Sequence, residues 1–90
     1  MNYQSELKGF LDDKGKLTHM PSKHEKRKTA LEMIRDKFEN DKNYNEKEVN
    51  EIIKGIISFS DHETVRRELI SAKMLNRTLD GAKYWRSQIG

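Results

Sequence analysis

The chain has 90 residues, of which 37% are charged and 33% are hydrophobic, so it suits one small domain with a small core and a heavily solvated surface. It contains no cysteine, which excludes a disulfide framework and a zinc ribbon. Its 18 basic and 15 acidic residues leave a net charge of +3, which is compatible with a nucleic-acid partner and equally with a protein partner.

The N-terminal segment, residues 1–20, predicts an additional helix and a linker that pack on a domain formed by residues 21–90. The run Asp12-Asp13-Lys14-Gly15 is typical of a helix stop. No stretch of the chain resembles a signal peptide or reaches the roughly 20 apolar residues of a membrane-spanning helix, so we expect a cytoplasmic protein without membrane contact. The apolar residues with helical spacing in this segment are Tyr3, Leu7, Phe10 and Leu11.

Three further helices are predicted, and their starts share one capping pattern. A Ser or Asn precedes a Glu by three residues, so that the first side chain can accept from the N3 amide while the Glu reaches back to the N-cap amide. The three matches begin at Ser22, Asn45 and Ser60. The apolar stripes that follow predict helices over residues 22–38, 46–57 and 61–73.

The helix over residues 46–57 is the most apolar element and is expected to form the centre of the core. Ile70, on the next helix, lies off the core direction, so it is either covered by the N-terminal helix or part of a partner surface. The residues predicted to face inward are Ala30, Leu31, Ile34 and Phe38 on the first of these helices, Val49, Ile52, Ile53, Ile56 and Ile57 on the second, and Val65, Leu69 and Ala72 on the third.

A β-hairpin is predicted after the third helix. Residues 75–79 and 82–86 flank Asp80-Gly81, a strong signal for a type I′ turn, in which both central residues have positive φ. This turn would place Arg77 opposite Tyr84 and Asn76 opposite Trp85. The order of helix, tight turn, helix and hairpin predicts an α+β, mostly helical fold: a winged helix-turn-helix with three core helices, an extra N-terminal helix and a C-terminal β-hairpin wing.

Several motifs resemble those of the bacterial domain-of-unknown-function 2087 family, over about residues 10–85. Members similar to this chain are small stand-alone proteins or follow a helix-turn-helix domain in transcriptional regulators, so the resemblance implies a regulatory setting. It implies no catalytic or binding residues. The matching pieces are Phe10-Leu11-Asp12 with Gly15-Lys16-Leu17, Pro21-Ser22-Lys23, Tyr44-Asn45-Glu46-Lys47-Glu48-Val49-Asn50, Arg66-Arg67-Glu68-Leu69, and Asp80-Gly81 with Tyr84-Trp85.

The third of these helices would be the recognition helix of a helix-turn-helix, which enters the major groove. Arg66 or Arg67 could contact a guanine edge, while Lys73 and the wing reach phosphates. The alternative is a solvated helix in which Arg67 pairs with Glu63, Arg66 pairs with a neighbouring carboxylate, and the charges of the wing protect a sheet edge. The candidate nucleic-acid-binding residues are His62, Arg66, Arg67, Lys73, Arg77, Lys83 and Arg86.

No catalytic, cofactor-binding or metal-binding residues are predicted, and we expect no cofactor. His19, His24 and His62 are on different predicted elements, and no HExxH motif is present. The sequence also lacks a nucleophile elbow and a glycine-rich phosphate loop. We therefore expect that the protein is not an enzyme.

Two functions remain open. The first is a DNA-binding domain in transcription regulation, a monomer or a homodimer whose partner is duplex DNA. The alternative is a non-enzymatic protein-interaction or effector module with a winged-helix shape, whose partner is another regulatory protein. The alternative rests on the near-neutral charge, the acid-rich residues 39–51 and the position of Ile70.

Overall fold

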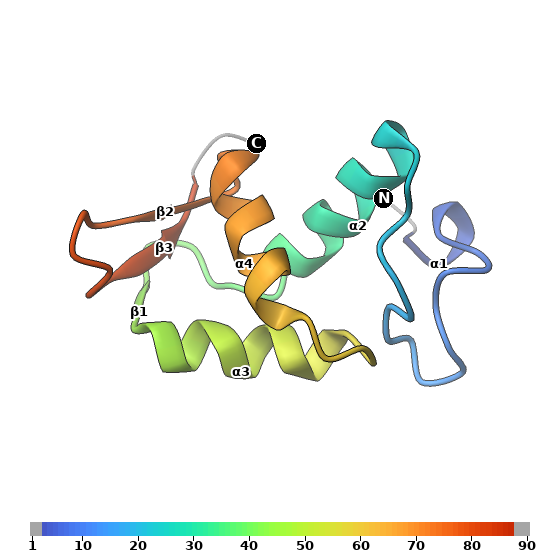
Figure 1. Ribbon diagram of the computed structural model, residues 1–90, viewed down its shortest axis with the longest axis horizontal. Helices are drawn as coiled ribbons and strands as arrows, with labels where there is room; N and C mark the ends of the chain where they lie inside the picture. The colour runs from blue at the N-terminus through green and yellow to red at the C-terminus, as the bar shows by residue number, and fades with distance from the viewer. Residues whose placement is uncertain (1–2, 88–90) are drawn as a thin grey trace.

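A computed structural model of the chain describes residues 3–87 and shows a helical body with a small sheet at one end (Figure 1). The strands form one antiparallel sheet in the order β1-β3-β2. This α+β arrangement is consistent with a winged-helix-like shape. No helix in this range is long and apolar enough to cross a bilayer. The elements are α1 (Tyr3–Glu6), α2 (His24–Arg35), β1 (Asn43–Tyr44), α3 (Glu46–Ile56), α4 (His62–Ser71), β2 (Leu75–Arg77) and β3 (Tyr84–Arg86).

The core lies where α2, α3 and α4 meet. As predicted, α2 contributes Ala30, Leu31 and Ile34, and Phe38 is buried just beyond its end. Ile52 and Ile56, also predicted inside, are only half-buried and pack at the edge of the core. The α3 and α4 side chains that are fully excluded from solvent are Val49, Ile53, Val65 and Leu69.

The end of α4 differs from the prediction. The helix stops at Ser71, and Ala72, predicted to be buried, is the exposed C-cap residue. Lys73 takes a left-handed conformation with φ of 62°. The amide of Lys73 then donates to the Ile70 carbonyl at 3.0 Å, and that of Met74 to the Leu69 carbonyl at 2.9 Å. These two bonds form a Schellman motif, which turns the chain away before Ala72 can reach the core.

One of the three predicted capping boxes is confirmed. The Asn45 side chain accepts from the Glu48 amide at 2.8 Å, and the Glu48 carboxylate accepts from the Asn45 amide at 2.9 Å. At α4 the prediction was wrong by one residue, because Asp61 caps the helix in place of Ser60. An ionised carboxylate suits the positive end of a helix dipole better than a hydroxyl does.

The predicted cap at Ser22 is wrong. The N-cap of α2 is Lys23, whose side chain makes no capping hydrogen bond. Ser22 therefore lies one residue too early for its hydroxyl to reach the first free amides of the helix. Pro21 before it is buried, and its carbonyl accepts from Arg27 Nη1 at 3.0 Å, which holds this segment against the helix.

The register of the hairpin is confirmed, but the turn type is wrong. Arg77 pairs with Tyr84 and Asn76 with Trp85, whereas the strands are shorter than predicted. Gly81 has φ of 72° and Asp80 does not have positive φ, so the turn is not type I′. The Thr78 hydroxyl accepts from the amides of residues 82 and 83, and Asp80 from that of residue 82. Backbone bonds from the Thr78 amide to the Lys83 carbonyl and from the Gly81 amide to the Thr78 carbonyl, both at 3.0 Å, close the turn, and the side-chain bonds stabilise it.

The strand β1 was not predicted. Its two residues pair with β3, with Asn43 opposite Trp85 and Tyr44 opposite Tyr84. Both tyrosines are buried. The strand lies between α2 and α3 in the chain and leads into α3, so the sheet is anchored to the helical body through its own first strand (Figure 1).

The N-terminal segment forms less helix than its spacing predicts. Only Tyr3–Glu6 are helical, and Gly9, with φ of 92°, belongs to the turns that follow. Leu17 is fully buried and forms a parallel bridge with Ile57. Its amide donates to the Ile56 carbonyl at 2.8 Å, and its carbonyl accepts from the Ser58 amide at 2.8 Å. Leu17 thus fastens the segment to the turn between α3 and α4.

Replacing Leu17 by Ala should therefore destabilise the whole fold. Truncating a fully buried leucine costs about 2–5 kcal/mol, which is a large part of the stability of a small domain. Leu79 is the matched control, because it is 103% exposed at the hairpin tip, and its change to Ala should cost less than about 0.5 kcal/mol. Urea unfolding followed by circular dichroism measures both, and similar losses for the two variants would contradict the burial of Leu17.

Candidate nucleic-acid interface

Three of the predicted arginines meet in one hollow. Arg66 and Arg67 on α4 and Arg77 on β2 line a surface hollow of about 370 Å³ between the helix and the hairpin. The remaining residues of its lining are Glu46, Ile70, Ser71 and Tyr84. A helix and a hairpin that present guanidinium groups to the same space are suited to an anionic, extended ligand.

Arg66 is turned toward α3 instead of solvent. Its side chain is only 15% exposed, it donates to the Asn50 side-chain oxygen, and its Nη2 lies 3.8 Å from a Glu46 carboxylate oxygen. Tyr84 also donates to Glu46, at 3.1 Å. Burial, followed by this hydrogen bond to a carboxylate, raises the pKa of Tyr84. Arg66 therefore holds α4 on α3 and cannot reach a base edge without leaving these partners.

Arg67 and Arg77 are the accessible guanidinium groups of the hollow. Arg67 is 74% exposed, and its Nη2 lies 3.9 Å from the Glu63 carboxylate one helical turn earlier. An exposed pair of this kind contributes at most about 0.5 kcal/mol, so Glu63 does not prevent Arg67 from binding an anion. Arg77 is exposed and extends toward Gly81, since a Cβ at that glycine would lie 3.6 Å from its Nη1.

His62, Lys73 and Lys83 lie outside the hollow. His62 is the first residue of α4 and is half-buried, whereas Lys73 is exposed just beyond the other end of the helix. Lys83 is exposed near the hairpin tip, beside Leu79. Within residues 3–87, no three His, Cys, Asp or Glu side chains gather in a way that could hold a metal ion.

Arg86 connects the sheet to the end of α2. It donates to the Phe38 carbonyl at 3.1 Å and to the Asp36 carboxylate at 3.4 Å, and its side chain is 23% exposed. Tyr3 and Arg35 donate to the same carboxylate. Asp36 therefore joins the N-terminal segment, α2 and β3. The structure places Arg86 in this network and not in the arginine hollow.

The Asp36 network shifts two pKa values. Burial alone would raise the pKa of Asp36, but hydrogen bonds from Tyr3 and Arg35 and the charges of Arg35 and Arg86 lower it below its ordinary value. For Tyr3, burial and then the hydrogen bond to Asp36 raise the pKa to about 12. Ionised Asp36 and neutral Tyr3 are thus the forms that the fold favours.

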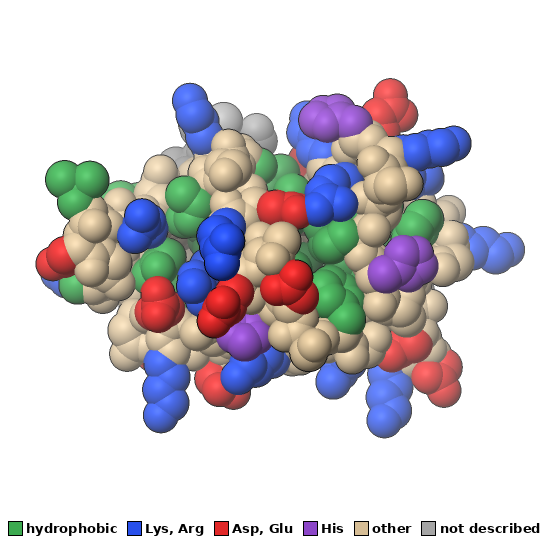
Figure 2. All heavy atoms as spheres, viewed as in Figure 1, with side chains coloured by type: hydrophobic (Ala, Val, Ile, Leu, Met, Phe, Trp, Pro, Cys, Tyr) green, Lys and Arg blue, Asp and Glu red, His purple; other side chains and the backbone are tan. Residues whose placement is uncertain are grey.

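Acidic side chains interrupt the basic surface. Figure 2 shows Lys and Arg side chains mixed with Asp and Glu over α3 and α4, without one continuous basic patch on this face. Glu46 and Glu63 account for part of this mixture beside the hollow. Negative charges near the guanidinium groups weaken the attraction of phosphates, so any nucleic-acid contact here is limited to a few arginines and lysines.

The family comparison assigns the chain to a bacterial family. The family model described as "Uncharacterized protein conserved in bacteria (DUF2087)" matches residues 16–86, and the chain belongs to this family. This confirms the family predicted from the sequence. Comparisons with curated proteins and with solved structures found no match. The matched range begins just before Leu17 and includes every residue of the arginine hollow.

Glu46, Ser71 and Tyr84 line the hollow but were not among the candidate residues. The predicted register placed Tyr84 opposite Arg77, and that signal could have located it. Glu46 carried no such signal, because the first residue of α3 reaches the hollow only through the packing of α3 against α4 and the sheet.

Replacing Asp36 by Asn should make stability less dependent on pH. Because its pKa is lower in the folded state, ionised Asp36 stabilises the fold above the ordinary Asp value of about 3.9, and this contribution is lost as the pH falls through the lower, folded value. Asp36→Asn should therefore unfold more easily at pH 7 and lose less stability on acidification below about pH 4. Asp13→Asn, on an exposed loop residue, is the control, and thermal unfolding at several pH values is the measurement. If the melting temperatures of Asp36→Asn and the native chain changed with pH in the same way, the stabilising role of the Asp36 network would be contradicted.

Replacing Lys73 by Gly should stabilise the protein. A left-handed conformation costs a residue with a Cβ about 1 kcal/mol, and Gly avoids this cost at the C′ position. Lys73→Gly should thus raise the free energy of unfolding, measured with urea, by about 1 kcal/mol. Lys73→Ala removes the same charge and keeps the strain, so it should gain nothing. Equal gains from the two variants would show that charge and not backbone strain is responsible.

Proposed function

We propose that this protein is a winged-helix-like domain that binds duplex DNA and acts in transcription regulation without catalysing a reaction. The observation that supports this most is that the accessible guanidinium groups of Arg67 on α4 and Arg77 on the hairpin line one hollow. A helix-turn-helix followed by a hairpin is an arrangement in which one helix enters the major groove while the hairpin lies along the backbone. In this proposal α4 is the recognition helix and β2–β3 is the wing.

The accessible groups divide into base and backbone contacts. Arg67, being 74% exposed, contacts a base edge or a phosphate in the major groove. Arg77 and Lys83 contact the backbone from the wing, and His62 and Lys73 lie at the two ends of α4 for peripheral contacts. The geometry favours different roles for the other two predicted residues: Arg66 positions α4 against α3, and Arg86 positions β3 against α2.

The affinity of a single domain should be modest. Few cations are exposed around the hollow, and Glu46 and Glu63 lie among them. Proteins with a helix-turn-helix commonly gain affinity as dimers that bind two half-sites one helical turn apart. We therefore propose that the domain binds DNA as a homodimer or together with another DNA-binding domain.

Replacing Arg67 and Arg77 together by Ala should weaken DNA binding at least about tenfold, because two contacts to base edges or phosphates are lost. The slope of log K against log salt should also become shallower by about 1 to 2, because each phosphate contact contributes about 0.9 and Arg67 contacts either a base edge or a phosphate. Fluorescence anisotropy with duplex DNA at several salt concentrations is the measurement.

The matched control is Lys14→Ala/Lys37→Ala, which removes the same charge far from the hollow. It should leave both the affinity and the salt slope unchanged apart from a small general effect. Absence of DNA binding by the native chain at low salt would refute the proposal. Equal losses in the two double variants would show only non-specific attraction to DNA.

One observation favours the alternative of a protein-interaction module. Ile70 is half-buried and lines the same hollow as the arginines, whereas α1, which could have covered it, packs on α2 at the other end of the molecule (Figure 1). A partner protein on this face would need Ile70 and would tolerate the loss of Arg67. Loss of partner binding in Ile70→Asp with retention in Arg67→Ala, measured by pull-down from the native host, would support this alternative against DNA binding.

A further inference from the structure

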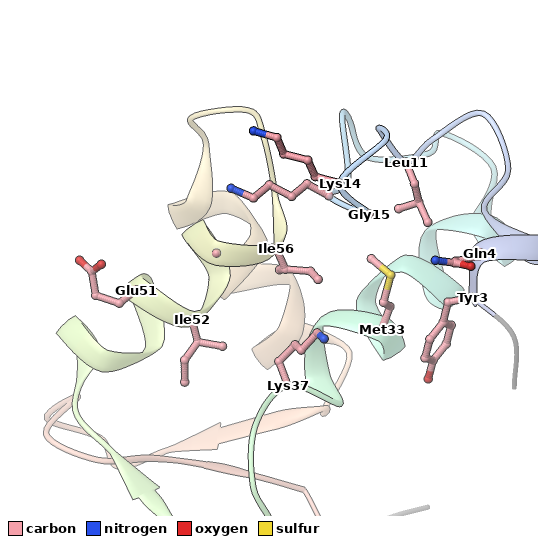
Figure 3. Close-up of a pocket in the computed structure, with 12 residues that line it drawn as sticks. Tyr3, Gln4, Leu11, Lys14, Gly15, Met33, Lys37, Glu51, Ile52 and Ile56 are labelled. Carbon is pink, nitrogen blue, oxygen red and sulfur yellow. The ribbon is translucent and has the colours of Figure 1, made fainter.

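A second concave surface lies on a different part of the molecule. It is a groove of about 990 Å³ between the N-terminal segment, α2 and α3, and it shares no residue with the arginine hollow. Figure 3 shows Met33 of α2 and Ile56 of α3 facing the same space, with Leu11 beyond them. Leu11, Ile52 and Ile56 are only half-buried although each packs on the core. The groove therefore leaves part of an apolar row uncovered.

Lysines surround this apolar row. Lys14 and Lys37 lie on opposite sides of Ile56 (Figure 3), and Lys16 also lines the groove. Within residues 3–87, none of these three lysines forms a side-chain ion pair. The one acidic residue of the lining, Glu51, has its carboxylate 4.0 Å from Lys54, outside the groove. The rim thus carries an excess of positive charge that the fold itself does not neutralise.

The loop that carries two of these lysines is held in place. The Asp12 carboxylate accepts from the amides of Lys14 and Lys16, both at 2.9 Å, and the Asp12 amide donates to the Lys16 carbonyl at 2.8 Å. The Asp12 carboxylate, which belongs to the same loop as Lys14 and Lys16, is therefore engaged with the loop backbone. Its bonds position both lysines beside the groove before any ligand arrives.

Gly55 contributes bare backbone to the groove. It lies within α3, where Gly is less favourable than Ala, and a Cβ built on it would meet nothing within 4 Å. The packing of the domain therefore gives no reason for glycine at this position. Close approach of a partner to the α3 backbone would explain the glycine, because the partner would occupy the space that a side chain would fill.

We propose that this groove is a docking site for an acidic amphipathic helix of a partner protein. The uncovered apolar row matches the apolar face of such a helix, and the unpaired lysines match acidic residues beside that face. A small-molecule ligand fits less well, because sites for small molecules enclose most of the ligand, whereas this groove is open to solvent. The proposal does not depend on DNA binding, since it uses other residues and another surface.

The test is a selection from a displayed library of random peptides of about 16 residues, which as helices span about 24 Å. The library is selected in parallel on the full chain and on its Lys14→Glu/Lys37→Glu variant. Peptides enriched on the native chain should combine apolar residues at helical spacing with acidic residues. In fluorescence anisotropy they should bind the variant at least about tenfold more weakly, because two attractive charge pairs become repulsive.

Three further measurements define the site. Arg67→Glu/Arg77→Glu carries the same change in charge on the other surface and should bind these peptides like the native chain. In amide NMR spectra, the peptide should shift the signals of Gly15 and Gly55 and leave that of Gly81 unchanged. Gly55→Met should raise the midpoint of urea unfolding, because it removes a helical glycine, and should weaken peptide binding, because it fills the groove.

Five outcomes would overturn the proposal. Four of them are the absence of any peptide that distinguishes the native chain from Lys14→Glu/Lys37→Glu, equal losses of peptide affinity in the arginine variant, unchanged peptide affinity in Gly55→Met, and a dimer in sedimentation that Lys14→Glu/Lys37→Glu dissociates. The last outcome would mean that a second copy of this chain occupies the groove. Binding of decanoate in place of peptide, followed by the same glycine signals, would also overturn it, because it would assign the groove to an anionic amphiphile.

Discussion

Burial of Val65 and Leu69 determines which way every other side chain of α4 points. Both are fully excluded from solvent in the cluster that also holds Val49 and Ile53 of α3. Because successive residues are turned by about 100°, seating these two against α3 leaves Arg66 beside α3 and Arg67 in solvent. Val65, Leu69 and Ile70 are the only apolar residues of α4, so the helix has no second apolar stripe with which it could pack. The burial of Val65 and Leu69 thus explains why Arg66 packs against α3 while Arg67 remains accessible.

The parts of the structure that the sequence predicted well depend on neighbours close in the chain. The capping box at Asn45 joins residues three apart, and the hairpin register follows from a short connection around Gly81. The buried residues of α2, and Val49 and Ile53 of α3, follow from helical periodicity, which is a local property. At the candidate site, the same local geometry brought Arg66, Arg67 and Arg77 to one hollow, because a helix and the hairpin after it lie next to each other.

What the sequence did not predict depends on contacts between distant residues. Leu17 bridges to Ile57, and Arg86 reaches Asp36 across 50 positions. No periodicity reports such pairs, so Leu17 was assigned to a linker and Arg86 to a DNA-binding wing. The end of α4 is a different case: Lys73 adopts the left-handed conformation that usually requires glycine. Helical spacing predicted that Ala72 is buried, but the turn of helix that would bury it does not form.

The short strand β1 limits how the hairpin can move. Tyr44 pairs with Tyr84, and the next residue along the chain, Asn45, is the N-cap of α3. Strand β3 is therefore held beside the first turn of a core helix, and a displacement of β3 would pull on that cap. Residues 78–83 form the loop of the hairpin and extend beyond the residues that pair with β1. A ligand that bends the hairpin would deform these six tip positions before it disturbs the helical body.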